Sequence, residues 1–344
     1  MTALPTRQTV VIAGAGPIGL ACAISARRHG LDPLVIDAGA VCNAIVHYPI
    51  GMTFFTTPER LEIGGHPLAC GGAKPTREEV LMYYRGIVRN EGIRVRTYTR
   101  LRNAARHADG VHCSVATRLG EETVRCDRLV LATGYFDHPN RLDVSGEDLP
   151  HVSHYFREAH PDYGLDAVVI GGKNSAVEAA LALFRAGARV TLVYRGTAFP
   201  RSVKYWLRPD IENRIKACEI QARLGATIVR IEPRHIVIRN AQGEEESLPA
   251  DRVYALTGFQ PDFALFERIG IALDRESRRP ALDPETFETN VPGVHLAGSV
   301  TRGRATSDIF IENGRFDGEK IFGDAEDRER ARRLYAEVNR QYGE

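Results

Sequence analysis

The 344-residue sequence predicts an α/β protein with two Rossmann-like dinucleotide-binding domains, each carrying a β-meander. A glycine-rich turn follows an apolar run twice, at residues 14–19 after TVVIA and at residues 171–176 after DAVVI. A second pattern also repeats, because DRLVLATGY at 127–135 is echoed by DRVYALTGF at 251–259. The D-R and T-G pairs keep the same offset, which indicates two copies of one βαβ-plus-meander unit.

The first copy is predicted to begin with a strand over residues 9–13, the turn at 14–19 and a helix over 20–29. The next strand, 34–36, ends at Asp37. A strand, a turn and a helix in this order are the context in which G-x-G-x-x-G binds a nucleotide, so the motif carries more weight than its spacing alone.

The second copy repeats the order, with a strand over residues 167–170, the turn at 171–176 and a helix over 177–185. Its next strand, 190–194, ends at Arg195. The apolar residues of the predicted helix recur at helical spacing, so one face is expected to pack on a sheet.

Downstream of each βαβ unit lie short alternating stretches typical of a β-meander, VHCSVAT at 111–117 and RHIVIR at 234–239. Gly30 and Gly187 follow the predicted helices, where a left-handed residue commonly ends a helix. Residues 43–80 are an extra segment rich in Gly, Pro and Thr, which is either a surface excursion or a cover over a cofactor.

The first turn is predicted to bind a nucleotide. Gly14 permits the tight turn, Gly16 lets a pyrophosphate approach the backbone, and Gly19 allows close packing of the helix. The helix N-terminus supplies N–H groups and a positive dipole end for the phosphates. Asp37, at the end of the next strand, is placed to accept hydrogen bonds from ribose hydroxyls. Pro17 and Ile18 complete the predicted contact set.

The second turn differs from the first in ways that indicate NADPH. Lys173 replaces the middle glycine and Ala176 the last, while Arg195 stands where an NAD site would have an acid. A guanidinium pairs with a 2′-phosphate, which a carboxylate would repel. The alternative interpretation is a solvated basic face. Further basic residues follow: Arg201, Lys204 and Arg208.

Composition excludes several other classes of function. A net charge of +1 gives no reason to expect nucleic acid or an anionic membrane as partner. No apolar run is long enough to span a bilayer and residues 1–9 lack signal-peptide character, so we expect a cytoplasmic protein. Residues 325–344 are predicted as a solvated, charged helix. The six cysteines form no C-x-x-C pair and no zinc spacing, so we expect no metal: Cys22, Cys42, Cys70, Cys113, Cys126 and Cys218.

Together the motifs resemble those of thioredoxin-reductase-like FAD/NAD(P)H flavoproteins. The resemblance rests on G-A-G-P-x-G at 14–19, A-T-G at 132–134, T-G at 257–258 and A-G at 297–298, and it covers essentially the whole chain. It implies FAD in the first domain and NADPH in a second domain inserted into the first. The boundaries that we expect are 1–150 and 285–344 for the FAD-binding domain, and 151–284 for the NADPH-binding domain.

The resemblance also implies a set of contacts beyond the two turns. For FAD these are Tyr48, Thr133, Gly134, Gly298, Ser299 and Ile309, with Gly298 and Ser299 at the pyrophosphate and ribityl chain and Ile309 near the isoalloxazine. Ser299 departs from the Asp usual at its position. For NADPH the implied contacts are Gly171, Gly172, Lys173, Asn174, Ser175, Ala176, Glu178, Arg195, Lys204, Thr257 and Gly258.

Longer strings are similar to the YpdA-type branch, which is associated with bacillithiol-disulfide reduction. They are YPIGMTFFTTPERLEIG (48–64), HYFREAHP (154–161), GGKNSAVEAAL (171–181), VYRG (193–196) and IFIENGRF (309–316). The resemblance implies a homo-oligomer, a dimer. It also exposes a departure, since Ile18 stands where the family's first turn commonly has a cysteine. No catalytic residue is assigned, and His47, Tyr48, His151 and His154 are the proton donors that we considered.

Three functions fit these observations. The first is NADPH-dependent reduction of a low-molecular-weight disulfide such as bacillithiol disulfide, with hydride passing from NADPH to flavin N5. The second is a ferredoxin- or flavodoxin-type NADP reductase, whose small electron-carrier protein would dock on an Arg-rich stretch such as 94–106. The third, a flavin monooxygenase, ranks last because Val144 and Pro150 replace the Phe and His of F-x-G-x-x-x-H. A nucleotide-sensing module without catalytic activity is the remaining alternative. A dithiol relay is excluded by the absent cysteine pair.

Overall fold

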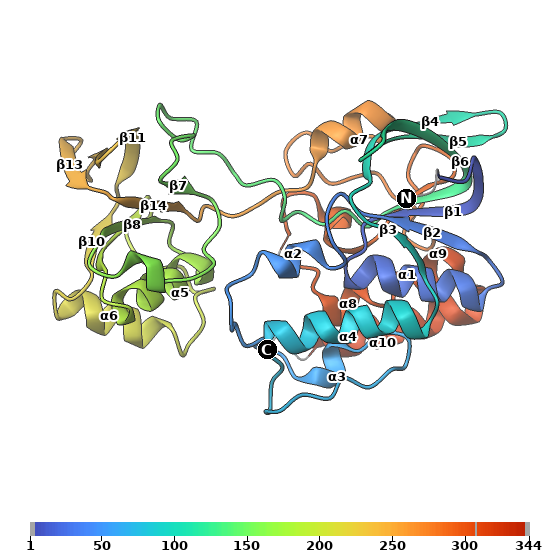
Figure 1. Ribbon diagram of the computed structural model, residues 1–344, viewed down its shortest axis with the longest axis horizontal. Helices are drawn as coiled ribbons and strands as arrows, with labels where there is room; N and C mark the ends of the chain where they lie inside the picture. Colours follow the sequence, from blue (N-terminus) through green and yellow to red (C-terminus); the bar gives the residue numbers. More distant parts are fainter. Residues whose placement is uncertain (1–3, 307, 341–344) are drawn as a thin grey trace. The chain divides into compact units, whose positions relative to one another are not determined.

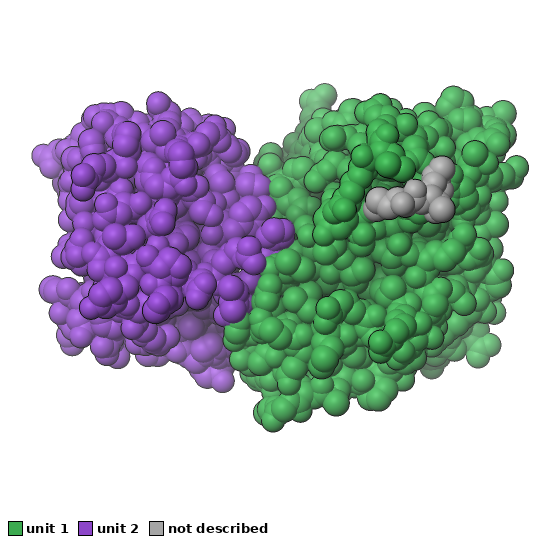
Figure 2. All heavy atoms as spheres, viewed as in Figure 1, with its two compact units in different colours: residues 1–46, 51–138, 259–344 green, residues 47–50, 139–258 purple. Residues whose placement is uncertain are grey.

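The protein is described by a computed structural model over residues 4–306 and 308–340. Its chain divides into two compact units. The first comprises the described residues up to 46, residues 51–138, and the described residues from 259 onward. The second comprises residues 47–50 and 139–258 (Figure 2). Each unit is an α/β structure with its own sheet and core.

The first unit is built on a sheet with strand order β3-β2-β1-β6-β5-β4, and β15 pairs beside the end of β6 (Figure 1). β2, β3 and β15 belong to the parallel part, whereas β4 and β5 pair antiparallel. The long β6 therefore belongs both to the predicted meander and to the parallel sheet. The strands are β1 (Arg7–Ala13), β2 (Pro33–Ile36), β3 (Arg94–Arg96), β4 (Arg100–His107), β5 (Gly110–Thr117), β6 (Gly120–Leu131) and β15 (Val294–Leu296).

The helices of this unit include α1, which begins at Pro17 rather than at residue 20 as predicted. Proline suits the first helical position, because its missing N–H has no intrahelical partner there. The predicted C-terminal helix is present as far as Arg340, and residues 341–344 lie outside the described residues. The helices are α1 (Pro17–Arg28), α2 (Asn43–Val46), α3 (Pro58–Leu61), α4 (Arg77–Asn90), α7 (Phe263–Ile269), α8 (Ile311–Gly314), α9 (Asp317–Phe322) and α10 (Ala325–Arg340).

The second unit repeats the plan with a separate meander. Its parallel sheet has the order β10-β9-β8-β14-β7, and β11-β12-β13 form an antiparallel sheet. The strands are β7 (Val152–Ser153), β8 (Asp166–Ile170), β9 (Arg189–Tyr194), β10 (Gln221–Leu224), β11 (Thr227–Glu232), β12 (His235–Arg239), β13 (Glu245–Pro249) and β14 (Arg252–Ala255), and the helices are α5 (Asn174–Arg185) and α6 (Arg208–Lys216). β8 lies between β9 and β14 as β1 lies between β2 and β6, which confirms the predicted α/β repeat.

The borders of the units differ from the predicted 150/151 and 284/285. The second unit begins at residue 139, because Leu142, Val144 and Leu149 pack against its core. It ends at residue 258, because α7 buries Phe263 and Phe266 in the core of the first unit. The segments 142–149 and 263–269 carry none of the glycine motifs, so the core that receives their apolar side chains decides to which unit they belong. No helix within the described residues has the length and apolarity needed to cross a bilayer.

Candidate nucleotide-binding sites

The first turn lies at the carboxyl end of β1, between β2 and β6. Gly14 has φ +115°, and a Cβ atom there would lie 2.2 Å from the carbonyl oxygen of Ala132. A Cβ on Gly19 would lie 1.9 Å from the carbonyl oxygen of Gly14. Around Gly16, which precedes α1, no atom lies within 4 Å of that position. Two glycines are therefore required by the protein's own packing, and the third leaves open space at the helix N-terminus.

Asp37 is fixed beside this turn by two backbone donors. One carboxylate oxygen accepts from the N–H of Ala15 at 2.7 Å, and the other accepts from the N–H of Gly39 at 2.7 Å. Burial raises the pKa of Asp37 above its ordinary value, and the two backbone hydrogen bonds oppose that shift. Each oxygen retains a lone pair, so the carboxylate is able to accept from ribose hydroxyls as the sequence predicted.

The strongest indication of a ligand site lies just after the end of β6, at Thr133 and Gly134. The hydroxyl of Thr133 is buried and has no hydrogen-bond partner within the described residues. The next residue, Gly134, has φ +66°, and nothing lies within 4 Å of its Cβ position. Buried hydroxyls are normally paired. An unpaired hydroxyl next to open backbone therefore fits a bound nucleotide, and the residues present at this edge fit FAD.

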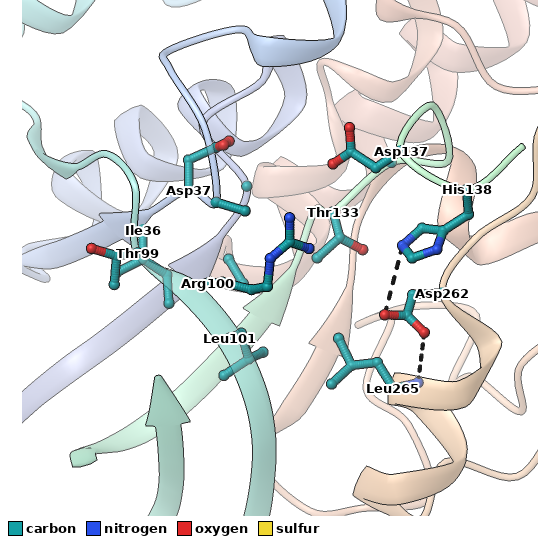
Figure 3. Close-up of a pocket in the computed structure, with 14 residues that line it drawn as sticks. Ile36, Asp37, Thr99, Arg100, Leu101, Thr133, Asp137, His138, Asp262 and Leu265 are labelled. Carbon is teal, nitrogen blue, oxygen red and sulfur yellow. Dashed lines mark hydrogen bonds and ion pairs between the residues drawn. The ribbon is translucent and has the colours of Figure 1, made fainter. Parts of the chain in front are cut away.

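A pocket opens at the same edge (Figure 3). Asp37 and Thr133 line it, together with residues that sequence reasoning missed. Figure 3 shows Arg100 reaching into the pocket from β4, with Asp37 on one side and Asp137 on the other. His138 lies at the same pocket, and its Nε2 is 3.7 Å from a carboxylate oxygen of Asp262. No motif marks Arg100 or Asp137, since one opens a meander strand and the other lies in a loop.

The late A-G segment returns to this unit after β15. Gly298 has φ +78°, and its N–H donates to a carboxylate oxygen of the fully buried Asp317 at 2.7 Å. Ser299 and Ile309 are buried. Cβ atoms built on Gly298 and Gly314 would lie 2.7 Å and 2.6 Å from Cδ1 of Ile18. Ile18 therefore fills a niche between these glycines, and no thiol chemistry is available at its position.

The second turn has the backbone geometry of the first. Gly171 has φ +142°, and a Cβ there would lie 2.5 Å from the carbonyl oxygen of Leu256 and 2.9 Å from Cβ of Ala176. A Cβ on Gly172 would lie 2.4 Å from the ring of Tyr194, so this glycine makes room for an aromatic side chain. Lys173 precedes α5 as Gly16 precedes α1, and its side chain is exposed.

The first turn of α5 organises the loop that follows β9. The amide of Asn174 donates to the carbonyl oxygen of Ser202 at 3.1 Å and accepts from the N–H of Lys204 at 2.9 Å. The ammonium of Lys204 lies 4.0 Å from a carboxylate oxygen of the exposed Glu178. Ser175 is exposed in the same helical turn. The predicted NADPH residues of α5 and the loop are thus brought together on one side of the unit.

Arg195 directly follows β9, as Asp37 directly follows β2. Its side chain is exposed, and it makes no ion pair with a described residue. Arg208, by contrast, pairs with Glu212 at 2.9 Å. Among the basic residues of this segment, Arg195 is therefore both available and at the position where a ribose substituent would lie in the first site.

Thr257 and Gly258 occupy the place of Thr133 and Gly134 in the repeat, but their surroundings differ. The hydroxyl of Thr257 donates to the carbonyl oxygen of Asn140 at 2.7 Å, and the amide of Asn140 donates to the carbonyl oxygen of Thr257 at 3.2 Å. The N–H of Asn140 donates to the carbonyl oxygen of Gly258 at 2.9 Å. The hydroxyl of Thr257 thus already has a structural partner.

Tyr48 lies in the segment 47–50, which belongs to the second unit, whereas the other predicted FAD residues belong to the first. The N–H of Ile50 ties this segment to the carbonyl oxygen of Arg157 at 2.9 Å. The His47 ring lies 5.8 Å from the ring of Tyr155. Nε2 of His154 lies 3.3 Å from a carboxylate oxygen of the buried Glu147, and neither ring nitrogen makes a hydrogen bond with a described residue.

Four of the six cysteines are buried and are not set up as nucleophiles. Cys22 and Cys42 are fully buried, and burial raises the pKa of both thiols well above its ordinary value. Cys113 and Cys126 lie with their Sγ atoms 3.8 Å apart in the core of the meander. A reactive cysteine needs an accessible, stabilised thiolate, and burial removes both conditions. These four cysteines are therefore unsuited to a thiol relay, whereas Cys218 is exposed and Cys70 is partly exposed.

Two nucleotide turns on two Rossmann-like units, with no C-x-x-C pair in the sequence, define a dinucleotide-dependent flavoprotein reductase. The chain belongs to the pyridine nucleotide-disulphide oxidoreductase family, whose pattern matches residues 11–298. It is an FAD-dependent NAD(P)H oxidoreductase. It is 41% identical over 323 residues to bacilliredoxin reductase Bdr of Bacillus subtilis (strain 168), with 94% of this chain and 99% of that protein covered.

A solved structure gives the same result. Bacillithiol disulfide reductase Bdr (YpdA) from Bacillus cereus is 39% identical, superposes with a TM-score of 0.90, and the match covers 94% of this chain and 99% of that one. The predicted membership of the YpdA-type branch is thereby confirmed. A ferredoxin–NADP reductase of Ignicoccus hospitalis is 27% identical over 304 residues, covering 86% of this chain and 90% of the relative.

Proposed function

We propose that this protein reduces bacillithiol disulfide with electrons from NADPH. The observation that carries the proposal is the pairing of a full-length similarity to Bdr proteins with a site that contains no cysteine pair. A reductase that lacks its own dithiol passes electrons to its acceptor either directly or with one nearby thiol, and we propose the direct route. A small disulfide is suited to that role, because it is able to reach a buried cofactor that a protein dithiol cannot.

The net reaction consumes one NADPH, one disulfide and one proton, and it yields NADP⁺ and two thiols. The S–S bond breaks as each sulfur gains one electron, and the two thiols together take up two protons. When bound, FAD would supply the redox chemistry, which is to take up a hydride from the nicotinamide and to pass two electrons to the disulfide. The protein's own residues orient the two dinucleotides and exclude water.

For FAD, the proposed contacts are the first turn, Asp37, Thr133 and Gly134, with Gly298, Ser299 and Ile309 following β15. The support is their geometry, above all the unpaired hydroxyl of Thr133 and the open space at Gly16. Arg100 joins this set from the pocket. Tyr48 stays a proposal that rests on the family resemblance alone.

For the nicotinamide cofactor, we propose the second unit as the binding domain and NADPH as its ligand. Arg195 is assigned to the 2′-phosphate, because it is exposed and lacks an ion-pair partner among the described residues. Lys173 and Lys204 add positive charge around the turn. Thr257 and Gly258 are proposed to shape the site through their hydrogen bonds with Asn140.

A second candidate function is ferredoxin–NADP reduction, which the similarity to the Ignicoccus hospitalis enzyme favours. Exposed arginines at 94, 102 and 106 would offer a basic docking face for an acidic carrier. The identity is lower than to the Bdr proteins, so this function ranks second.

The test is an anaerobic reoxidation assay. The FAD-loaded protein is reduced with one equivalent of NADPH and then mixed with bacillithiol disulfide, oxidised ferredoxin or oxygen, while flavin absorbance is followed. We expect reoxidation by bacillithiol disulfide to be at least tenfold faster than by the other two. Faster reoxidation by ferredoxin would replace the proposal with the second candidate. A protein that cannot be loaded with FAD would contradict both.

We further propose that the protein is a homodimer, an inference that rests on the family resemblance. Light scattering during gel filtration should give twice the 38.0 kDa mass of the chain. A mass of one chain at micromolar concentration would contradict it.

A further inference from the structure

The first unit contains a second cavity, away from the ends of β1 and β2. It has a volume of about 330 Å³, and it shares no lining residue with the pocket around Asp37. This volume is in the range of pockets that hold small organic ligands. Its walls come from the segment 279–287, the turn after β15, and helices α9 and α10.

The lining combines cationic and apolar side chains. Arg279, Arg302 and Lys320 line the cavity, and Asp317 is its acidic residue. The Asp317 carboxylate already accepts the N–H of Gly298 at 2.7 Å. Positive charge is therefore in excess around the cavity. The apolar part of the lining consists of Pro280, Leu282, Pro284, Phe287 and Ile309.

Lys320 is the group that most needs a partner. Its side chain is buried, with 9% of its surface exposed, and no carboxylate of a described residue forms an ion pair with its ammonium. Instead, the ammonium lies 4.4 Å from the centre of the Phe287 ring and 5.2 Å from that of Tyr335. Aromatic faces attract a cation but compensate it only in part. Burial lowers the pKa of Lys320, as expected for an ammonium with incomplete compensation.

The residue whose ring faces Lys320, Phe287, has a strained backbone conformation. Phe287 has φ +54°, a left-handed conformation that is unfavourable for an aromatic residue. Its N–H donates to the carbonyl oxygen of Asp283 at 2.9 Å, and its carbonyl oxygen accepts from the N–H of Leu296 at 3.1 Å. Strain held by surrounding hydrogen bonds is a common feature of ligand sites. Here it brings the Phe287 ring to the cavity and to Lys320.

We propose that this cavity binds a small organic carboxylate, with the carboxylate on Lys320 and the apolar body against Pro280, Leu282 and Phe287. A single negative charge matches one ammonium that the two aromatic rings and Asp317 compensate only in part. Apolar walls favour an organic body over a bare inorganic anion. A neutral ligand of the same shape would leave Lys320 without a counter-ion.

The test uses the FAD-loaded protein and sodium benzoate as the probe, titrated by calorimetry at constant ionic strength. We expect saturable binding of one benzoate per chain, with a dissociation constant of about 1 mM or lower. Benzamide, the neutral analogue, and inorganic phosphate should each bind at least tenfold more weakly. No saturation at 50 mM, roughly fifty times that constant, would overturn the proposal.

Matched variants locate the site. Lys320→Met should weaken benzoate binding at least tenfold, whereas Arg330→Met, at an exposed basic residue of α10 outside the cavity lining, should leave it unchanged. Leu282→Phe keeps every charge and narrows the cavity, so it should also weaken binding, even if Lys320→Met does not fold. Equal affinity in wild type and Leu282→Phe, or equal binding of benzamide, would each overturn the assignment. These readouts do not depend on the disulfide acceptor, so the proposed function is tested separately.

Discussion

Two threonines at equivalent places in the repeat differ in the hydrogen bonding of their hydroxyl groups. The Thr133 hydroxyl is buried and unpaired within the described residues, whereas the Thr257 hydroxyl donates to Asn140 at 2.7 Å. We expect Thr133→Val to weaken FAD binding about tenfold without lowering the unfolding free energy of the FAD-free protein. Thr257→Val should instead cost about 1–2 kcal/mol of stability, because it breaks an existing hydrogen bond. Fluorescence titration with FAD and urea unfolding distinguish the two, and identical effects would contradict the assignment.

We expect Arg195 to decide the choice between the two nicotinamide cofactors. Arg195→Ala should raise the Michaelis constant for NADPH by about 10–100-fold, because charge-assisted hydrogen bonds to the 2′-phosphate are lost. The constant for NADH should change by less than about twofold. Arg234→Ala, at an exposed turn residue of the same unit, is the control. Equal effects of Arg195→Ala on both cofactors would remove Arg195 from the phosphate site.

At the residue scale, the sequence predicted the positions that backbone geometry requires. A Cβ atom built on Gly14, Gly19 or Gly171 would lie less than 3 Å from a carbonyl oxygen. Only glycine fits such positions, so they can be recognised in the sequence. Arg100 and Asp137 belong to no sequence motif, because their place in the pocket depends only on the fold. The difference between Thr133 and Thr257 could not be predicted from the sequence either, because it depends on a contact of Thr257 with Asn140, which is distant from it in the chain.

At the scale of elements, two glycines of the first turn have different roles at the start of α1. Gly19 is needed for packing, and Gly16 leaves space for a ligand. Gly19→Ala would put a Cβ 1.9 Å from the Gly14 carbonyl oxygen, so we expect a loss of about 3 kcal/mol or more in unfolding free energy. Gly16→Ala meets no protein atom within 4 Å. It should leave the FAD-free protein's stability within about 0.5 kcal/mol and weaken FAD binding at least tenfold. Urea unfolding and FAD titration measure both, and normal FAD binding by Gly16→Ala would contradict the pyrophosphate position.

Strands and helices next to the glycine turns followed the predicted order, with starts earlier by one to three residues. Pro17 and Asn174 each begin a helix three residues before the predicted position, because residues of the turn itself form the first helical turn. The borders between the units were less predictable. Segments such as 142–149 and 263–269 have no distinctive pattern, and only the core that buries them shows where they belong.

At the scale of the whole molecule, one buried acid links stability to pH. Burial raises the pKa of Asp317 to about 7. Between pH 4 and 7, roughly, the folded protein therefore holds a proton that the unfolded chain has released, so this group lowers stability as pH rises. Asp317→Asn removes the effect. The variant should gain about 1–4 kcal/mol relative to wild type between pH 5 and pH 8 in urea unfolding.

The matched control is Asp274→Asn, at an exposed acid whose pKa is lowered by hydrogen bonds with Ser277. Its carboxyl is ionised in both the folded and unfolded states above pH 5, so its difference from wild type should be constant from pH 5 to pH 8. A constant difference for Asp317→Asn as well would contradict the raised pKa.

Electron transfer to the acceptor without a cysteine relay is tested most directly by anaerobic stopped-flow reoxidation of a Cys22→Ala/Cys42→Ala variant. Both thiols are buried near the first turn, and Cys218→Ala, at an exposed cysteine, is the control. After reduction with NADPH, the flavin of the double variant should be reoxidised by bacillithiol disulfide within about twofold of the wild-type rate, since the electrons pass directly to the disulfide. Loss of reoxidation in the double variant alone would show that a cysteine takes part. Failure of bacillithiol disulfide to reoxidise the wild-type protein would contradict the proposed function itself.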